Sequence, residues 1–127
     1  MDQDVRAALD AGGIADITTT GRKTGIPRRI EIYFHQFDGR YYLTGRPSSR
    51  RRDWEANIIA HPEFTLHLKR GITADVAVTG KPEPDEEERG RILRRALIEN
   101  WDSPPEGVDA SLHKWVAASP FIEFEPV

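Results

Sequence analysis

The residues best suited to chemistry lie in one short segment that contains two glycines, TTTGRKTGIPR at residues 18–28. Glycines allow backbone conformations in which amide groups converge on an anion. Arg22, Lys23 and Arg28 add positive charge, and an arginine can donate two parallel hydrogen bonds to a phosphate. Thr24 adds a hydroxyl donor. From residue types alone, a phosphate site and a solvated basic turn are equally good interpretations.

The spacing of this segment differs from that of a P-loop, and the segment joins two expected strands rather than opening a helix. A second basic stretch holds Arg46 and the run 50–52, which is either a solvated face or a second anion contact. The whole chain carries a net charge of -3. A basic cluster in an acidic protein indicates a local anion site, because a nucleic-acid surface needs a broader basic face.

Other reactive side chains are few. The chain has no cysteine, which excludes disulfides, thiolate metal sites and cysteine nucleophiles. The four histidines show no metal-ligand spacing, so we expect no metal site; they are His35, His61, His67 and His113. Trp54 suits core packing first and a cofactor wall second.

The pattern of apolar residues indicates which elements position these groups. Residues 28–37 alternate between an apolar and a polar face, as in a half-buried strand, and Asp38-Gly39 predicts a tight hairpin after it. Asp85-x-x-Glu88 predicts a helix start. Strands are expected at about 14–20, 28–37, 40–44, 63–69, 72–79 and 121–125. Helices are expected at 3–11, 53–60, from 85 onward and at 110–117, with a loop over 102–107.

This order of elements favours a mainly β, α+β fold: an antiparallel β-barrel with helices filling its gap. The strands do not alternate regularly with helices, so a Rossmann sheet is disfavoured. The length of 127 residues, with 38% apolar and 31% charged residues, fits one globular domain over 1–127. No apolar run approaches the about 20 residues of a membrane span. Since the first residues do not form a secretory signal, we expect a cytoplasmic protein.

Three stretches of the sequence resemble the deazaflavin-dependent nitroreductase family, whose members use coenzyme F420. They are the segment at 18–28, the hairpin at 38–43 and the pattern Trp54-x-x-Asn57-x-x-Ala60-x-Pro62. The resemblance runs from Ile14 to Lys69 and continues more weakly to the C-terminal strand. It implies a split β-barrel of the PNP-oxidase type, related to the FMN-binding flavin reductases.

The resemblance also implies roles for individual residues. The cofactor's phosphate and acidic tail are expected against Arg22, Lys23, Thr24 and Arg28. The deazaflavin ring is expected against Thr44, Gly45, Arg46 and Pro47, and further contacts against Asp53, Trp54 and Asn57. Tyr33 matches a tyrosine that faces the substrate pocket, where it either protonates a reduced substrate or lines the cavity. Family members usually have paired glycines in the ring-binding loop, and Pro47 has no amide hydrogen to offer the ring.

The function implied is hydride transfer from reduced F420 to a small, flat acceptor such as a quinone, an enone or a nitroaromatic. FMN is the alternative cofactor. One alternative function is a non-catalytic protein of the same fold that binds or stores F420, FMN or a haem-related group. A small nucleic-acid-binding barrel is the second, disfavoured by an aromatic content of only 9%. We expect a homodimer, no nucleic-acid partner and no membrane span.

Overall fold

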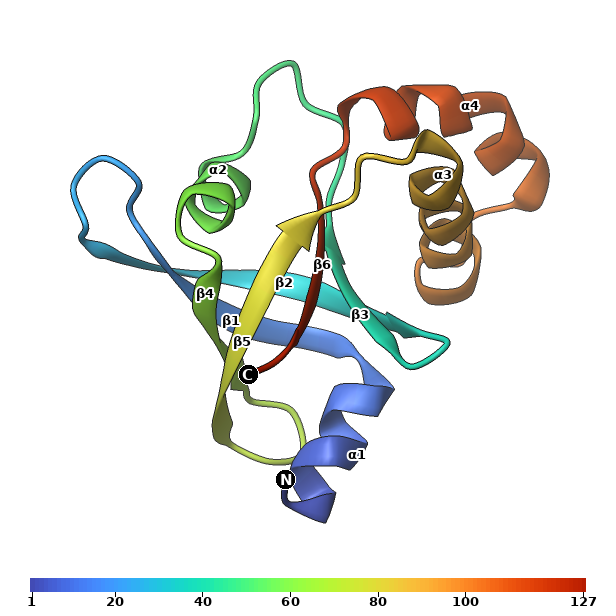
Figure 1. Ribbon diagram of the computed structural model, residues 1–127. Coiled ribbons are helices and arrows are strands. Elements are labelled where there is room, and N and C mark those ends of the chain that lie inside the picture. Colours follow the sequence, from blue (N-terminus) through green and yellow to red (C-terminus); the bar gives the residue numbers. More distant parts are fainter.

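A computed structural model, which describes all 127 residues, shows six antiparallel strands in a closed barrel (Figure 1). Around the barrel the order is β1-β2-β3-β6-β5-β4, and β4 pairs back onto β1. The strands are β1 (Gly13–Thr20), β2 (Pro27–Phe37), β3 (Arg40–Thr44), β4 (Glu63–Leu68), β5 (Ala74–Pro82) and β6 (Phe121–Pro126). The helices are α1 (Gln3–Ala11), α2 (Asp53–Ala60), α3 (Glu86–Arg95), the π-helical η1 (Ala96–Asn100) and α4 (Pro105–Ala118). The predicted antiparallel α+β barrel is confirmed.

The barrel interior is filled by the inward residues of alternating strands, since successive side chains of a strand point to opposite faces. Phe34, Leu43, Leu66, Val78 and Ile122 are among its fully or almost fully buried members. Burial of this apolar surface is the main force that holds the strands together.

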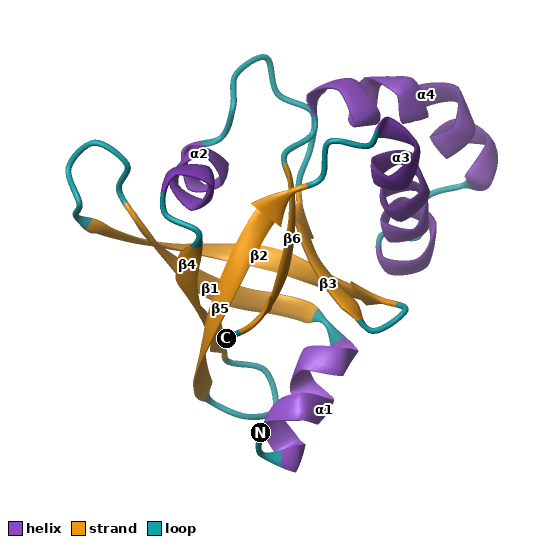
Figure 2. Cartoon of the chain, viewed as in Figure 1, coloured by secondary structure: helices purple, strands orange, loops and turns teal.

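A second apolar layer covers the outer face of β2, β3 and β6. Phe37, Tyr42 and Phe121 point outward from these strands and pack against Ile92 and Leu93 of α3. The helices α3 and α4 lie side by side over this part of the barrel (Figure 2). The remaining helices take other positions: α1 lies at one end of the barrel and α2 at the other.

The β1–β2 hairpin and α2 form the part of the fold that matters for the predicted site. The hairpin pairing continues to Thr20 opposite Pro27, and its far end projects beyond the barrel near α2 (Figure 1). Residues 27–31 of β2 are all exposed, whereas Phe34 and His35 are buried. The first half of β2 is therefore exposed on the surface, and its second half packs into the core.

Two expected boundaries are wrong. The strand expected at 72–79 begins and ends later, because Lys81 and Pro82 pair with Glu123 and Ile122 of β6. The loop expected over 102–107 ends early, since α4 begins at Pro105, where proline's fixed φ suits a first helical position. None of the helices is long and apolar enough to cross a membrane.

Candidate functional site

The far end of the hairpin and the start of α2 enclose a cavity of about 650 Å³, which we call the hairpin cavity. It is lined by all four residues predicted to contact the phosphate and the acidic tail, Arg22, Lys23, Thr24 and Arg28. The three residues at the helix start that were predicted to make further cofactor contacts also line it: Asp53, Trp54 and Asn57. Thr19, Gly21, Ile30, Glu31 and Arg52 complete the lining. The structure thus brings together residues from two segments of the chain, the β1–β2 hairpin and the start of α2.

The glycines shape the turn in a different way from the one predicted. The Gly21 amide donates to the Ile26 carbonyl at 3.0 Å, and the Gly25 amide donates to the Gly21 carbonyl at 2.8 Å. The Ile26 amide donates to Thr24 Oγ1 at 3.1 Å. These three amides are therefore used within the turn. Among the residues at its tip, the Lys23 and Thr24 amides donate to no protein group and stay available to a ligand.

Asn57 connects α2 to the hairpin. Its Oδ1 accepts from the Arg22 amide at 3.0 Å and from Arg22 Nη1 at 3.2 Å. Its Nδ2 donates to Thr19 Oγ1 at 3.2 Å, and its side chain is buried. The polar atoms of Asn57 thus engage protein groups, so this residue positions Arg22. Thr19, which the sequence analysis missed, completes the connection; no local pattern marks it, because its partner lies in α2.

The charges around the hairpin cavity are unequally compensated. Arg22 Nη2 lies 3.4 Å from an Asp53 carboxylate oxygen whose side chain is 88% exposed. Lys23 and Arg28 are exposed and form no ion pair. Two cations without a carboxylate partner favour an anionic ligand at this point.

The first turn of α2 adds further donors. Its N-cap is Arg52, whose side chain makes no capping hydrogen bond to the helix. The amides at the start of a helix have no partner within the helix, and the helix dipole makes this end attractive to anions. Only the Arg46 carbonyl, at 3.4 Å, accepts a hydrogen bond from the Arg52 side chain. The run of basic residues at 50–52 thus supplies one cation to the hairpin cavity.

The residues predicted to contact the deazaflavin ring lie outside the hairpin cavity, against the end of α4. Thr44 Oγ1 donates to the Pro120 carbonyl at 2.6 Å, and Gly45 lies against the Pro120 ring. The Ser48 amide donates to the Ala118 carbonyl at 3.0 Å. Arg46 and Pro47 are exposed between these contacts.

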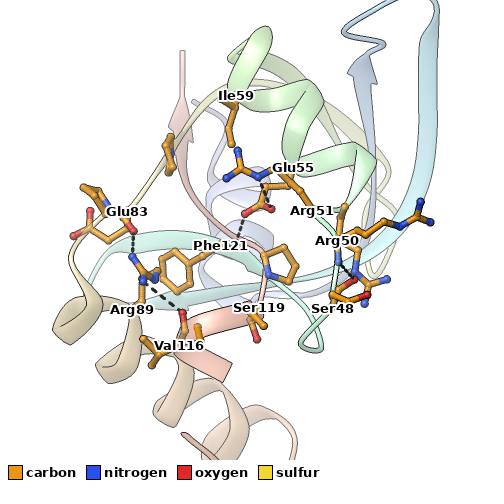
Figure 3. Close-up of a pocket in the computed structure, with 17 residues that line it drawn as sticks. Ser48, Arg50, Arg51, Glu55, Ile59, Glu83, Arg89, Val116, Ser119 and Phe121 are labelled. Atoms are coloured by element: carbon orange, nitrogen blue, oxygen red, sulfur yellow. Dashed lines mark hydrogen bonds and ion pairs between the residues drawn. The ribbon is translucent and has the colours of Figure 1, made fainter. Parts of the chain in front are cut away.

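A second cavity of about 380 Å³ begins where this loop ends, and we call it the helix cavity (Figure 3). It lies between α2, the start of α3 and the end of α4, and Arg52 lines both cavities. Arg89 donates from Nη1 to the Glu83 carbonyl at 2.8 Å and from Nη2 to the Val116 carbonyl at 3.4 Å. Glu55 Oε2 accepts from the Phe121 amide at 2.8 Å. The sequence analysis did not find Arg89 or Glu55, since the packing of distant helices brings them together.

Tyr33 lies apart from the hairpin cavity. It is five residues beyond Arg28 in an uninterrupted strand pairing, so the two side chains point to opposite faces of β2. Its ring centroid is 4.9 Å from that of His35 and 5.8 Å from that of Trp101. Extending the β2–β3 register by one residue sets Tyr33 beside Thr44. Its contact with the acceptor stays a prediction.

The histidines have separate surroundings. His67 bridges neighbouring strands, with Nε2 2.6 Å from Thr18 Oγ1 and Nδ1 2.7 Å from Asp75 Oδ1. His35 is fully buried, and its Nδ1 lies 2.6 Å from the Asn100 side-chain amide. Burial lowers the pKa of His35 from its usual 6.5 to about 4, so its ring is neutral at neutral pH.

Comparison with protein families identifies the family to which the chain belongs. A family model described as F420H(2)-dependent quinone reductase matches residues 4–112. The chain belongs to this family. As a member of the F420H(2)-dependent quinone reductase family, the protein is an F420-dependent oxidoreductase, as the sequence resemblance implied.

Solved structures share the fold of this quinone reductase family member. An F420 reductase is 18% identical, with 100% of this chain and 96% of that chain covered and a TM-score of 0.64. A putative pyridoxamine 5'-phosphate oxidase from Listeria innocua is 14% identical, with 97% and 90% covered and a TM-score of 0.65. A protein described as a domain-swapped dimer is 18% identical, with 97% and 95% covered and a TM-score of 0.60. These similarities confirm the PNP-oxidase-like barrel.

Proposed function

We propose that the hairpin cavity holds the phosphate and acidic tail of F420, and that the stretch Thr44–Pro47 lies against its ring. The observation that carries this proposal is the pair of unpaired cations, Lys23 and Arg28, beside the free amides of residues 23 and 24. A phosphate and carboxylates need this kind of donor set. The residues present therefore fit the group.

The acceptor in this proposal is a quinone. Bound F420H2 supplies a hydride and a proton, and a quinone that accepts both becomes a hydroquinone. The protein's own residues bind and orient: Asn57 fixes Arg22, and the uncapped start of α2 faces the negative end of the ligand. FMN is the alternative cofactor, and it lacks the acidic tail that the extra cations would hold.

The test is a titration of F420 and FMN against the wild type and Lys23→Ala. A hydrogen bond to a charged group contributes about 1.5–3 kcal/mol, so we expect Lys23→Ala to weaken F420 binding by roughly 10- to 100-fold. The melting temperature should scarcely change, because Lys23 is exposed in a turn.

Lys114→Ala is the matched control, since it removes one exposed lysine from α4, outside both cavities. Its affinity for F420 should equal that of the wild type. Equal affinity of Lys23→Ala and the wild type would remove Lys23 from the site, and tighter binding of FMN than of F420 would contradict the cofactor assignment.

The proposed assembly is a homodimer. The similarity to a protein described as a domain-swapped dimer supports it. Sedimentation equilibrium at micromolar concentration should give the mass of two chains. A monomer mass that persists across the concentration series would overturn the proposal.

A further inference from the structure

The helix cavity carries an excess of positive charge, and all but one of its arginines lie outside the hairpin cavity proposed for the F420 tail. Four arginines line it, Arg50, Arg51, Arg52 and Arg89, against two glutamates, Glu55 and Glu83. Only one of these arginines approaches a carboxylate, at 3.8 Å between Arg51 Nε and Glu55 Oε1. The cavity therefore favours a ligand that carries a negative charge.

Arg89 is the cation best prepared to bind such a ligand. Two backbone carbonyls, of Glu83 and Val116, hold its guanidinium at the cavity wall without neutralising its charge (Figure 3). A guanidinium has five N–H donors, so donors remain for a ligand. Because Arg89 is already fixed by these two contacts, little side-chain entropy would be lost on binding.

The cavity also offers the surroundings of a small-molecule site. Its volume of about 380 Å³ lies within the range of such sites, and Ile59 and Phe121 provide apolar surface beside the arginines. The Ser119 hydroxyl, which belongs to the lining, is buried and makes no hydrogen bond within the protein.

The position of the helix cavity connects it to the proposed reaction. Ala118 and Pro120 line the cavity and also contact Ser48, Gly45 and Thr44, the loop that the proposed function sets against the cofactor ring. An acceptor must reach this ring for hydride transfer. We infer that the helix cavity receives the acceptor, and that the preferred acceptor is a flat quinone bearing a carboxylate, held by Arg89 and Arg51. This inference rests on the proposed function.

The test compares two acceptors of the same ring system, a naphthoquinone carboxylate and a neutral methylnaphthoquinone, in the oxidation of F420H2. The measured quantity is the ratio of kcat/KM for the two acceptors, which we expect to fall about 10-fold in Arg89→Gln and about 3-fold in Arg51→Gln, relative to the wild type. Arg51 gives the smaller effect because its side chain is 60% exposed. Titration calorimetry of the carboxylate with the cofactor-free protein should show the same order of affinities.

Arg70→Gln is the control, because Arg70 is exposed in the β4–β5 turn and lines neither cavity. Its ratio should equal the wild-type value. If Arg89→Gln has a lower melting temperature than the wild type, the ratio measured for Arg51→Gln and the calorimetry of the wild type still test the inference. An unchanged ratio in both variants, or a loss of F420 affinity in place of acceptor preference, would overturn the inference. Failure to oxidise F420H2 with either acceptor would instead contradict the proposed function.

Discussion

Three cations of the hairpin turn differ in how much freedom they keep. The Arg22 guanidinium donates to Asn57 Oδ1 and lies 3.4 Å from an Asp53 carboxylate oxygen, whereas Lys23 and Arg28 have no protein partner. A held cation gives direction to a bound anion, and a free one adapts to it at a cost in side-chain entropy. Arg22 is therefore suited to orienting the phosphate, and Lys23 to adding attraction.

A single buried histidine sets a pH limit on the stability of the fold. The pKa of His35 is about 4 in the folded chain and near 6.5 when unfolded. As the pH falls, the unfolded state thus binds a proton at His35 before the folded state does. The contribution of His35 to the free energy of unfolding is therefore complete above pH 6.5 and is lost as the pH falls toward 4. We expect a loss of up to about 3 kcal/mol of unfolding free energy over this interval.

The measurement is urea unfolding of the wild type and His35→Phe across this pH interval. The variant has no imidazole to protonate at this position, so its unfolding free energy should depend less on pH. His113→Gln, a change at an exposed histidine in α4, serves as the comparison and should follow the wild type. Parallel pH profiles for the wild type and His35→Phe would show that His35 does not set this limit.

The helix α2 contributes residues to both cavities. Its packing against the barrel depends on Gly80 of β5. A Cβ at Gly80 would lie 2.8 Å from Ile122 Cγ2 and 3.0 Å from both Ile58 Cγ2 and Phe64 Cε1. Real Cβ atoms avoid such distances, so a side chain here must push α2 or the core apart. We expect Gly80→Ala to lower the free energy of unfolding by about 1–3 kcal/mol.

Gly107→Ala provides the matched change. No atom lies within 4 Å of a Cβ at Gly107, and this residue is inside α4, where alanine is favoured over glycine by up to about 1 kcal/mol. Thermal unfolding should therefore show a lower melting temperature for Gly80→Ala and an equal or higher one for Gly107→Ala. Equal stability of the wild type and Gly80→Ala would mean that α2 can move without cost.

The elements also show where the sequence was sufficient and where it was not. The strand alternation over residues 28–37 and the Asp38-Gly39 turn predicted β2 and β3, because both signals are local. The lining of the hairpin cavity was predicted from two sources: the residue types of the segment at 18–28, and the family resemblance for Asp53, Trp54 and Asn57. Arg89 lies in the helix cavity because α3 packs against the end of α4, and no local sequence pattern in either helix predicts this contact.

For the whole molecule, the distribution of charge matters more than its sum. The net charge is -3, yet unpaired cations gather on the hairpin turn and in the loop before α2. Exposed charges are screened over about 10 Å at an ionic strength of 0.1 M. We expect the affinity for F420 to fall as salt is added, and to fall less steeply in Lys23→Ala, because fewer charges contribute. Titrations at low and high sodium chloride measure both slopes, and a salt-independent affinity would indicate that binding depends on the ring alone.

The closed ring of strands has a consequence for the time the chain needs to fold. Its closing pairs join residues far apart in the sequence, such as Tyr41 with Phe124 and Ala15 with Leu68. The entropy of closing such long loops is lost before the contacts are gained, which typically slows folding to between milliseconds and seconds. Until β6 docks between them, β3 and β5 present unpaired edges. In that interval a strand from another chain competes for the same edges, so the conditions of refolding, and protein concentration above all, govern how much of the chain reaches the closed barrel.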